Sequence, residues 1–238
     1  MSGRTPPRSF VPRGVAARLA LLAGVVGVVA AAAAAQGPGV HPLSGRQFAQ
    51  PMSVDGADWL DRREREDEEE PGLGLRLLRI PKGATVGDVG AGSGYMTIRL
   101  AKIVGDAGRV YASDIQPGML QRLQRAVEKA KVGNVVPVLG AFDDPKLPPA
   151  ALDLVIMVDV YHELSQPQRV LQRIREALKP GGRLALFEYR AEDPSVPILP
   201  SHKMTKAQVK QEVEAEGFRQ QRVFDDLPRQ HLIVFVRP

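Results

Sequence analysis

A glycine-rich turn is the strongest chemical signal in the sequence. It follows a short apolar segment and reads Asp88-Val-Gly90-Ala91-Gly92-Ser-Gly94-Tyr95. Glycine suits such a turn because the backbone can then turn tightly and let a ligand approach closer than a Cβ would permit. Tyr95 and Thr97 stand where the dinucleotide fingerprint G-x-G-x-x-G requires its third glycine, and the sequence contains no phosphate-binding G-x-x-x-x-G-K-[ST]. The turn therefore predicts a ligand site of another kind.

An aspartate at the end of the next strand-like segment is a second candidate. Asp114 closes Val110-Tyr-Ala-Ser-Asp114, twenty residues beyond Gly94. In doubly wound nucleoside-binding folds, an acidic residue at this place accepts hydrogen bonds from the ribose hydroxyls. The alternative is an aspartate that only caps the helix beginning near Pro117. The glycine turn upstream favours the ribose-binding role.

Polar side chains also follow the fourth predicted strand. After Val158 come Asp159, Tyr161, His162 and Glu163. Ligands of open α/β sheets bind outside the carboxyl ends of the strands, so the first three are candidate catalytic residues. If the reaction removes a proton, His162 or Asp159 would be the base. Alternatively, His162 only supports the following helix.

Alternating strand-like and helix-like segments predict an α/β fold with a parallel sheet. The last two strands are joined by a short connection and should be antiparallel neighbours. The expected strands are 85–89, 109–113, 135–139, 153–158, 183–188, 218–224 and 231–236. The expected helices are 74–79, 94–104, 116–131, 167–178 and 204–216.

Composition excludes several classes of function. The formal net charge is +5, but four of the 32 basic residues and none of the 27 acidic ones fall within residues 1–35, so the remaining chain carries 28 basic against 27 acidic side chains. We therefore predict no nucleic-acid partner. The absence of cysteine excludes disulfides, thiolate metal sites and a cysteine nucleophile. No two of the four histidines have the i, i+4 spacing of a helical zinc site, so we predict no metal.

The N-terminal segment has the pattern of a targeting sequence. A basic stretch up to Arg18 precedes seventeen uncharged residues, 19–35, which end in an alanine run. We predict a signal peptide or membrane anchor over residues 1–35, hence a bacterial protein that is exported to the periplasm or tethered through residues 19–35. The alternative is a misassigned start and a cytoplasmic protein.

The rest of the chain is predicted to form an arm and one catalytic domain. Residues 36–71 would be a linker and helical arm. Within it, 36–56 would be a linker or an extended arm laid over the domain, and 57–70 one exposed helix that Pro71 stops. Residues 72–238 would be the domain. Within it, the proline-rich loop 190–204 is a candidate substrate lid.

Together these motifs resemble the class I S-adenosylmethionine (SAM)-dependent methyltransferases. The glycine run matches the family's first motif, an acidic residue followed by G-x-G-x-G, and Lys179-Pro-Gly-Gly182 precedes a segment like its fifth strand. The resemblance implies a Rossmann-like fold with a seven-stranded, mostly parallel sheet, an antiparallel C-terminal strand and helices on both faces. It also implies SAM as the cofactor. The implied cofactor-binding residues are Asp88, Gly90, Ala91, Gly92, Gly94, Tyr95, Asp114, Ile115, Phe142, Asp143 (with Asp144 as its alternative) and Val158.

The resemblance is greatest to the group that includes the ubiquinone and menaquinone biosynthesis methyltransferases (methyltransferase type 11). That group usually has Asn-Ala-x-x-x-His after the fourth strand, where this chain has Asp159-Val-Tyr-His162. This departure argues against a quinone acceptor. The implied function is methyl transfer to a small-molecule acceptor that the sequence does not identify. The alternative is an exported, non-catalytic ligand-binding module on the same fold.

Overall fold

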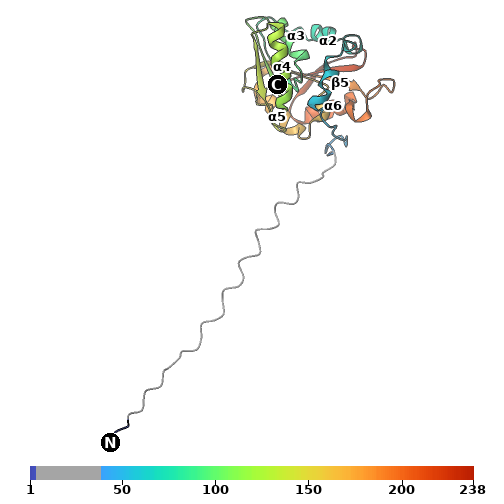
Figure 1. Ribbon diagram of the computed structural model, residues 1–238. Coiled ribbons are helices and arrows are strands. Elements are labelled where there is room, and N and C mark those ends of the chain that lie inside the picture. Colours follow the sequence, from blue (N-terminus) through green and yellow to red (C-terminus); the bar gives the residue numbers. More distant parts are fainter. Residues whose placement is uncertain (4–38) are drawn as a thin grey trace. The chain divides into compact units, whose positions relative to one another are not determined.

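The computed structural model describes residues 1–3 and 39–238, and the part of the chain from Pro38 onward forms one compact unit (Figure 1). The predicted signal peptide or anchor lies, apart from its first three residues, outside the described residues. Within the described residues, no helix is long and apolar enough to cross a membrane.

The sheet has the predicted arrangement. Its strand order is β3-β2-β1-β4-β5-β8-β7, and only β8 runs antiparallel to its neighbours β5 and β7. An eighth strand, β6, is two residues long and pairs with the end of β5. The strands are β1 (Thr85–Val89), β2 (Arg109–Asp114), β3 (Val135–Leu139), β4 (Leu152–Val158), β5 (Leu178–Arg190), β6 (Lys203–Met204), β7 (Arg219–Phe224) and β8 (Gln230–Val236).

Helices cover both faces of the sheet, as predicted (Figure 1). Side chains of the central strands alternate between two cores, as the period of a strand requires. One core receives apolar residues of α5 and α6, and the other those of α2 and α3; α4 packs beside α3 against β2 and β3. The helices are α2 (Pro71–Leu77), α3 (Tyr95–Val104), α4 (Pro117–Ala130), α5 (Pro167–Ala177) and α6 (Lys206–Ala215), with short 3-10 helices η2 (Tyr161–Glu163) and η3 (Pro200–His202).

The expected single helix over residues 57–70 is wrong. The segment forms a 3-10 helix, η1 (Val54–Asp61), and a short α1 (Arg65–Glu69). Glu70 has a left-handed backbone (φ 46°) that ends α1, and Pro71 begins α2 because proline is tolerated in a first helical turn. The charge run is not uniformly solvated either, since Arg65 and Glu69 are buried and form an ion pair at 2.6 Å.

The topology brings the candidate residues to one edge of the sheet. Parallel strands β1, β2, β4 and β5 all end at this edge, and antiparallel β8 begins there, so that Glu188 pairs with His231 and Tyr189 with Gln230. The residues that follow the parallel strands and those that begin β8 therefore share one region.

Candidate active site

The glycine turn between β1 and α3 has a backbone that side chains rarely allow. Gly90, Gly92 and Gly94 have φ values of +73°, +54° and +92°. A Cβ at Gly90 would lie 2.4 Å from a methyl carbon of Val160. Glycine is therefore required both by the dihedral angles and by the close approach of the segment that follows β4.

Two buried aspartates flank this turn. Asp114 accepts hydrogen bonds from the backbone N–H of Gly92 (2.9 Å, Oδ2) and of Gln116 (2.8 Å, Oδ1). Burial raises the pKa of Asp114, and these backbone bonds oppose the shift. Asp88 accepts a bond from the Thr97 hydroxyl at 2.6 Å, and burial raises the pKa of Asp88 to about 6. The structure thus brings together the glycine turn and Asp114, as predicted, and keeps Asp88 inside the domain beneath it.

These residues fit the ribose of SAM. A carboxylate offers about four lone-pair positions, and the two backbone bonds to Asp114 use two of them. The remaining positions can accept bonds from both ribose hydroxyls. The glycine turn supplies a surface free of side chains beside them. SAM, when bound, supplies a methyl group on a positively charged sulfur, which makes the methyl carbon electrophilic.

The N-terminal arm lies against the same turn, a contact that the sequence did not predict. Leu60 packs over Gly92, and the Ser93 hydroxyl donates to Asp61 at 2.7 Å. The side-chain amide of Gln116 donates to the backbone oxygen of Met52 at 2.8 Å. Residues 52–61 therefore form one wall of the cofactor site. The apolar Trp59-Leu60 pair within a charged segment is the only hint that the sequence gives of this contact.

The other predicted cofactor residues differ in placement. Phe142 is exposed just beyond β3. Asp143 pairs loosely with Arg169 at 3.4 Å, whereas Asp144 is held by both the backbone and side-chain nitrogens of Lys146. Asp143 is therefore the freer of the two carboxylates.

Four more predicted cofactor residues lie in or near the turn, namely Ala91, Tyr95, Ile115 and Val158. The Tyr95 hydroxyl donates to Glu66 at 2.7 Å and its ring lies under Arg65 and Arg99, so its side chain faces the arm. Ala91 is buried beside the turn, while Ile115 and Val158 are half-buried after β2 and at the end of β4. These four contribute, at most, backbone and apolar walls to the site.

Asp159 follows β4 in a strained conformation. Its φ of +55° lies in the left-handed region, which costs energy for a residue other than glycine. Both carboxylate oxygens accept bonds from the side-chain amide of Gln230, at 2.9 and 2.7 Å. Burial, together with nearby Glu69, raises the pKa of Asp159 well above its usual range, and Arg65 opposes this. Gln230 is a further site residue that the sequence did not reveal, because it reaches Asp159 only through the antiparallel pairing of β8.

Tyr161 does not face the acceptor side, which corrects its prediction as a catalytic residue. The side chain is fully buried among core residues, and its hydroxyl donates to Glu212 of α6 at 2.9 Å. Glu212 also accepts three bonds from Arg46 of the arm. Tyr161 therefore ties the arm and α6 to the core.

His162 is buried and held by a carboxylate. Its Nδ1 lies 2.6 Å from Glu188 Oε2, and Glu188 also accepts the backbone N–H of Tyr161. Burial alone would lower the pKa of His162, but the Glu188 carboxylate outweighs it and the pKa is raised. A charged residue inside the apolar strand 183–188 was the available signal for Glu188.

The other ring nitrogen of His162 meets two more polar side chains. His162 Nε2 lies 3.1 Å from Nδ1 of His202, which comes from η3 in the predicted lid loop. Glu163 Oε1 lies 4.0 Å from the first nitrogen and 3.9 Å from the second. Burial raises the pKa of Glu163 to about 7; His162 opposes this shift, and the nearby carboxylates of Glu188 and Asp114 add to it. These three side chains converge after β4, and the predicted cofactor residue Asp114 is near enough to raise the pKa of Glu163.

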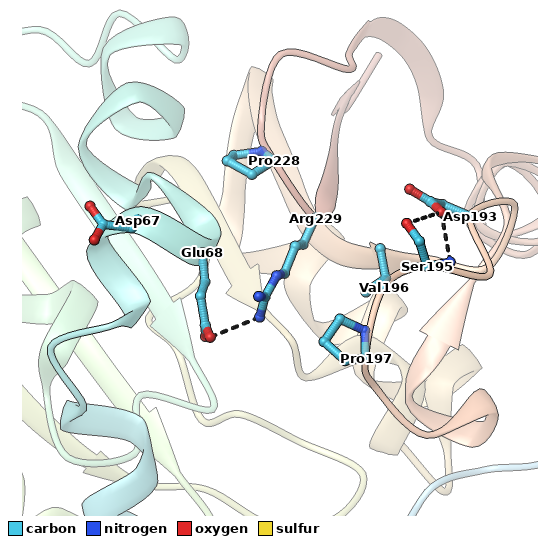
Figure 2. Close-up of a pocket in the computed structure, with 8 residues that line it drawn as sticks. All are labelled: Asp67, Glu68, Asp193, Ser195, Val196, Pro197, Pro228 and Arg229. Carbon is cyan, nitrogen blue, oxygen red and sulfur yellow. Dashed lines mark hydrogen bonds and ion pairs between the residues drawn. The ribbon is translucent and has the colours of Figure 1, made fainter.

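An open cleft of about 470 Å³ lies at the predicted lid loop (Figure 2). Arg229 crosses it to pair with Glu68 at 2.9 Å, while Asp193 accepts two bonds from Ser195 on the other side. The volume is in the range of small-molecule sites. The lid loop is thus one wall of a cleft; that it moves stays a prediction. The cleft is lined by Asp67, Glu68, Asp193, Ser195, Val196, Pro197, Pro228 and Arg229.

Comparison with known proteins agrees with this geometry. Residues 86–182 match a family model described as a methyltransferase domain. The chain is 30% identical over 111 residues to the ubiquinone/menaquinone biosynthesis C-methyltransferase UbiE of Enterobacter sp. (strain 638), a match covering 46% of this chain and 44% of that one. It is 28% identical over 123 residues to the demethylmenaquinone methyltransferase of Listeria monocytogenes serotype 4b, covering 52% and 51%. The chain thus spans about half the length of these relatives.

A solved structure is similar over a longer range. The SAM-dependent methyltransferase from Aquifex aeolicus superposes with a TM-score of 0.75 at 26% identity, covering 79% of this chain and all of that one. The sheet order, the glycine turn and Asp114 define a nucleoside-binding protein of the Rossmann-like class. Within that class, the chain is similar to the class I SAM-dependent methyltransferases.

Proposed function

We propose that the protein transfers a methyl group from SAM to a small-molecule acceptor. The observation that carries this proposal is the contact between Asp114 and the glycine turn, in which the carboxylate is fixed by the N–H of Gly92 and retains lone pairs for a ribose. The cleft at the lid loop has a volume suited to a small acceptor.

The acceptor side of this site is built on His162. In-line transfer of a methyl group depends mainly on alignment and on exclusion of water. Glu188 fixes the orientation of the imidazole, and the Nε2 atom of His162, which faces Nδ1 of His202, is able to take a proton or to bind a cation. Asp159 is the second candidate base, although Gln230 occupies both of its oxygens.

The names of the relatives suggest a quinone-like ring as acceptor, but the Asn-Ala-x-x-x-His sequence is replaced here. We therefore propose no quinone specificity. We also propose, from the N-terminal segment, that the enzyme acts in or beyond the bacterial membrane.

The test is calorimetric titration of SAM into the full chain and into Asp114→Ala. We expect saturable binding that weakens about 10- to 100-fold in the variant, since a lost hydrogen bond to a charged group costs about 1.5–3 kcal/mol. Asp106→Ala, at an exposed position after α3, is the control. Equal binding by the wild type and Asp114→Ala would contradict the assignment, and no binding at all would favour the non-catalytic module.

A further inference from the structure

We propose that His162, Glu163 and His202 form a binding site for one divalent transition-metal ion. The ligand atoms are Nε2 of His162, Nδ1 of His202 and a carboxylate oxygen of Glu163, and these lie within 4.8 Å of one another. No helical spacing predicts this group, because the two histidines are forty residues apart and meet only in the folded chain. The role of the ion in binding the methyl acceptor rests on the proposed function, but the metal site itself does not.

The two imidazoles already have the spacing of ligands on one ion. For metal–nitrogen bonds of about 2.1 Å, ligand atoms at tetrahedral to octahedral angles are about 3.0–3.4 Å apart. The two ring nitrogens are separated by 3.1 Å. Glu163 Oε1, at 3.9 and 4.0 Å, needs a side-chain rotation that shortens each distance by less than about 1 Å.

The surroundings of His162 are those of a metal-bound histidine. Ligating histidines commonly give their other ring N–H to a carboxylate, which fixes the tautomer and makes the ligand atom more basic. In this protein His162 gives its Nδ1–H to the fully buried Glu188, which leaves Nε2 without a proton in the neutral ring. His202 is partly exposed, so its Nε2 can carry the proton in solvent while Nδ1 binds the ion.

Glu163 supplies the negative charge that such an ion requires. Its side chain is largely buried, and among the residues that the structure describes its ion-pair partners are the same two histidines, neither closer than 3.9 Å. A carboxylate kept from water without a close cation is costly unless a cation joins it. Metal binding would therefore stabilise the ionised carboxylate of Glu163, the third ligand.

Two imidazoles and one carboxylate favour a first-row divalent ion such as Zn²⁺, Fe²⁺ or Co²⁺ over Mg²⁺ or Ca²⁺. Three protein ligands leave coordination positions open. Because the group lies after β4 and beside Asp114, those positions would hold an oxygen of the acceptor near the methyl group. His162 would then act as a ligand and not as a base.

The site can be tested by titrating Co²⁺ into the full chain, prepared without a histidine tag and freed of metal by a chelator, with visible absorption as the readout. We expect one saturable site in the wild type and at least tenfold weaker binding in His202→Gln and in Glu163→Gln. The His202 side chain is 29% exposed and is absent from the buried core, so its replacement leaves the core intact. His231→Gln, which removes a histidine bonded to Asp225 and Glu192 elsewhere, is the matched control and should bind as the wild type does.

The proposal is overturned if the wild type shows no saturable Co²⁺ binding, or if His202→Gln and His231→Gln titrate alike. A SAM titration of the same metal-free protein separates this result from the proposed function. Normal SAM binding without Co²⁺ binding would reject the metal site alone and return His162 to the role of base. Co²⁺ binding without SAM binding would support the metal site and reject the methyltransferase.

Discussion

Leu60 of the arm lies directly over Gly92 of the glycine turn. A Cβ at Gly92 would lie 3.0 Å from the Leu60 side chain. The residues that follow these two in the sequence are also in contact, because the Ser93 hydroxyl donates a hydrogen bond to Asp61. The arm and the turn therefore meet at the predicted cofactor site. Any side chain added at Gly92 has to displace either the arm or the ligand.

We expect Gly92→Val to abolish SAM binding while the protein remains folded. The φ of +54° disfavours a β-branched residue, and the new methyl groups would fill the space beneath Leu60. The measurement is SAM titration combined with denaturant unfolding.

Gly83→Val is the matched control for this change. Gly83 has a similar left-handed backbone (φ +80°), but nothing lies within 4 Å of the added Cβ. Both variants should lose about 1–3 kcal/mol of stability from backbone strain, and only Gly92→Val should lose the cofactor. Wild-type affinity in Gly92→Val would show that the turn does not hold SAM.

Replacing Asp88 by Asn should change how stability depends on pH. The pKa of Asp88 rises from 3.8 to about 6 on folding because the carboxyl is buried. The folded protein therefore holds this proton more tightly than the unfolded chain, and its stability falls as pH rises from about 4 to about 6. A shift of about two units corresponds to about 3 kcal/mol.

The stability of Asp88→Asn is compared with that of the wild type at each pH. The free energy of unfolding of Asp88→Asn, minus that of the wild type, should increase by about 3 kcal/mol between pH 4 and pH 7 and then level off. Urea unfolding at several pH values measures it, with Asp106→Asn as the control. A difference that is constant over this range would mean that Asp88 does not titrate as described.

The sequence predicted the mostly parallel sheet and the closeness of Asp114 to the glycine turn, for physical reasons. Alternating apolar segments separated by glycines give the strands and their directions but not their order in the sheet, and a residue just after a parallel strand must lie at the shared edge. Asp114 and the glycine turn depend only on these local rules. Their contact through the Gly92 N–H confirms the predicted neighbourhood.

The acceptor half depended on contacts that local rules do not reach. The left-handed backbone of Asp159 ends the alternation of β4, so the directions of Tyr161 and His162 could not be obtained by continuing the strand pattern. His202 approaches His162 from a loop forty residues away. The helical-spacing test for metal ligands could not detect that pair.

The arm was misjudged because its charges suggested solvent. Arg65 and Glu69 compensate each other inside the protein, and Arg46 does the same for Glu212. In the sequence, a charged residue that is buried with a partner cannot be distinguished from an exposed one. Only the folded chain reveals which of the many charges in residues 61–70 are paired internally.

Tyr161→Phe separates a structural role for this residue from the catalytic one predicted for it. The hydroxyl donates to Glu212 Oε2 at 2.9 Å inside the core, and its loss leaves Glu212 with Arg46 as the main donor. We expect the variant to lose about 1–3 kcal/mol of unfolding free energy and to bind SAM as the wild type does. Tyr111→Phe, in β2, is the control, because the Tyr111 hydroxyl makes no hydrogen bond within the described part of the chain. If Tyr161→Phe kept full stability but lost SAM binding or methyl transfer, the hydroxyl would belong to the active site after all, and the inward orientation of Tyr161 would not describe the working enzyme.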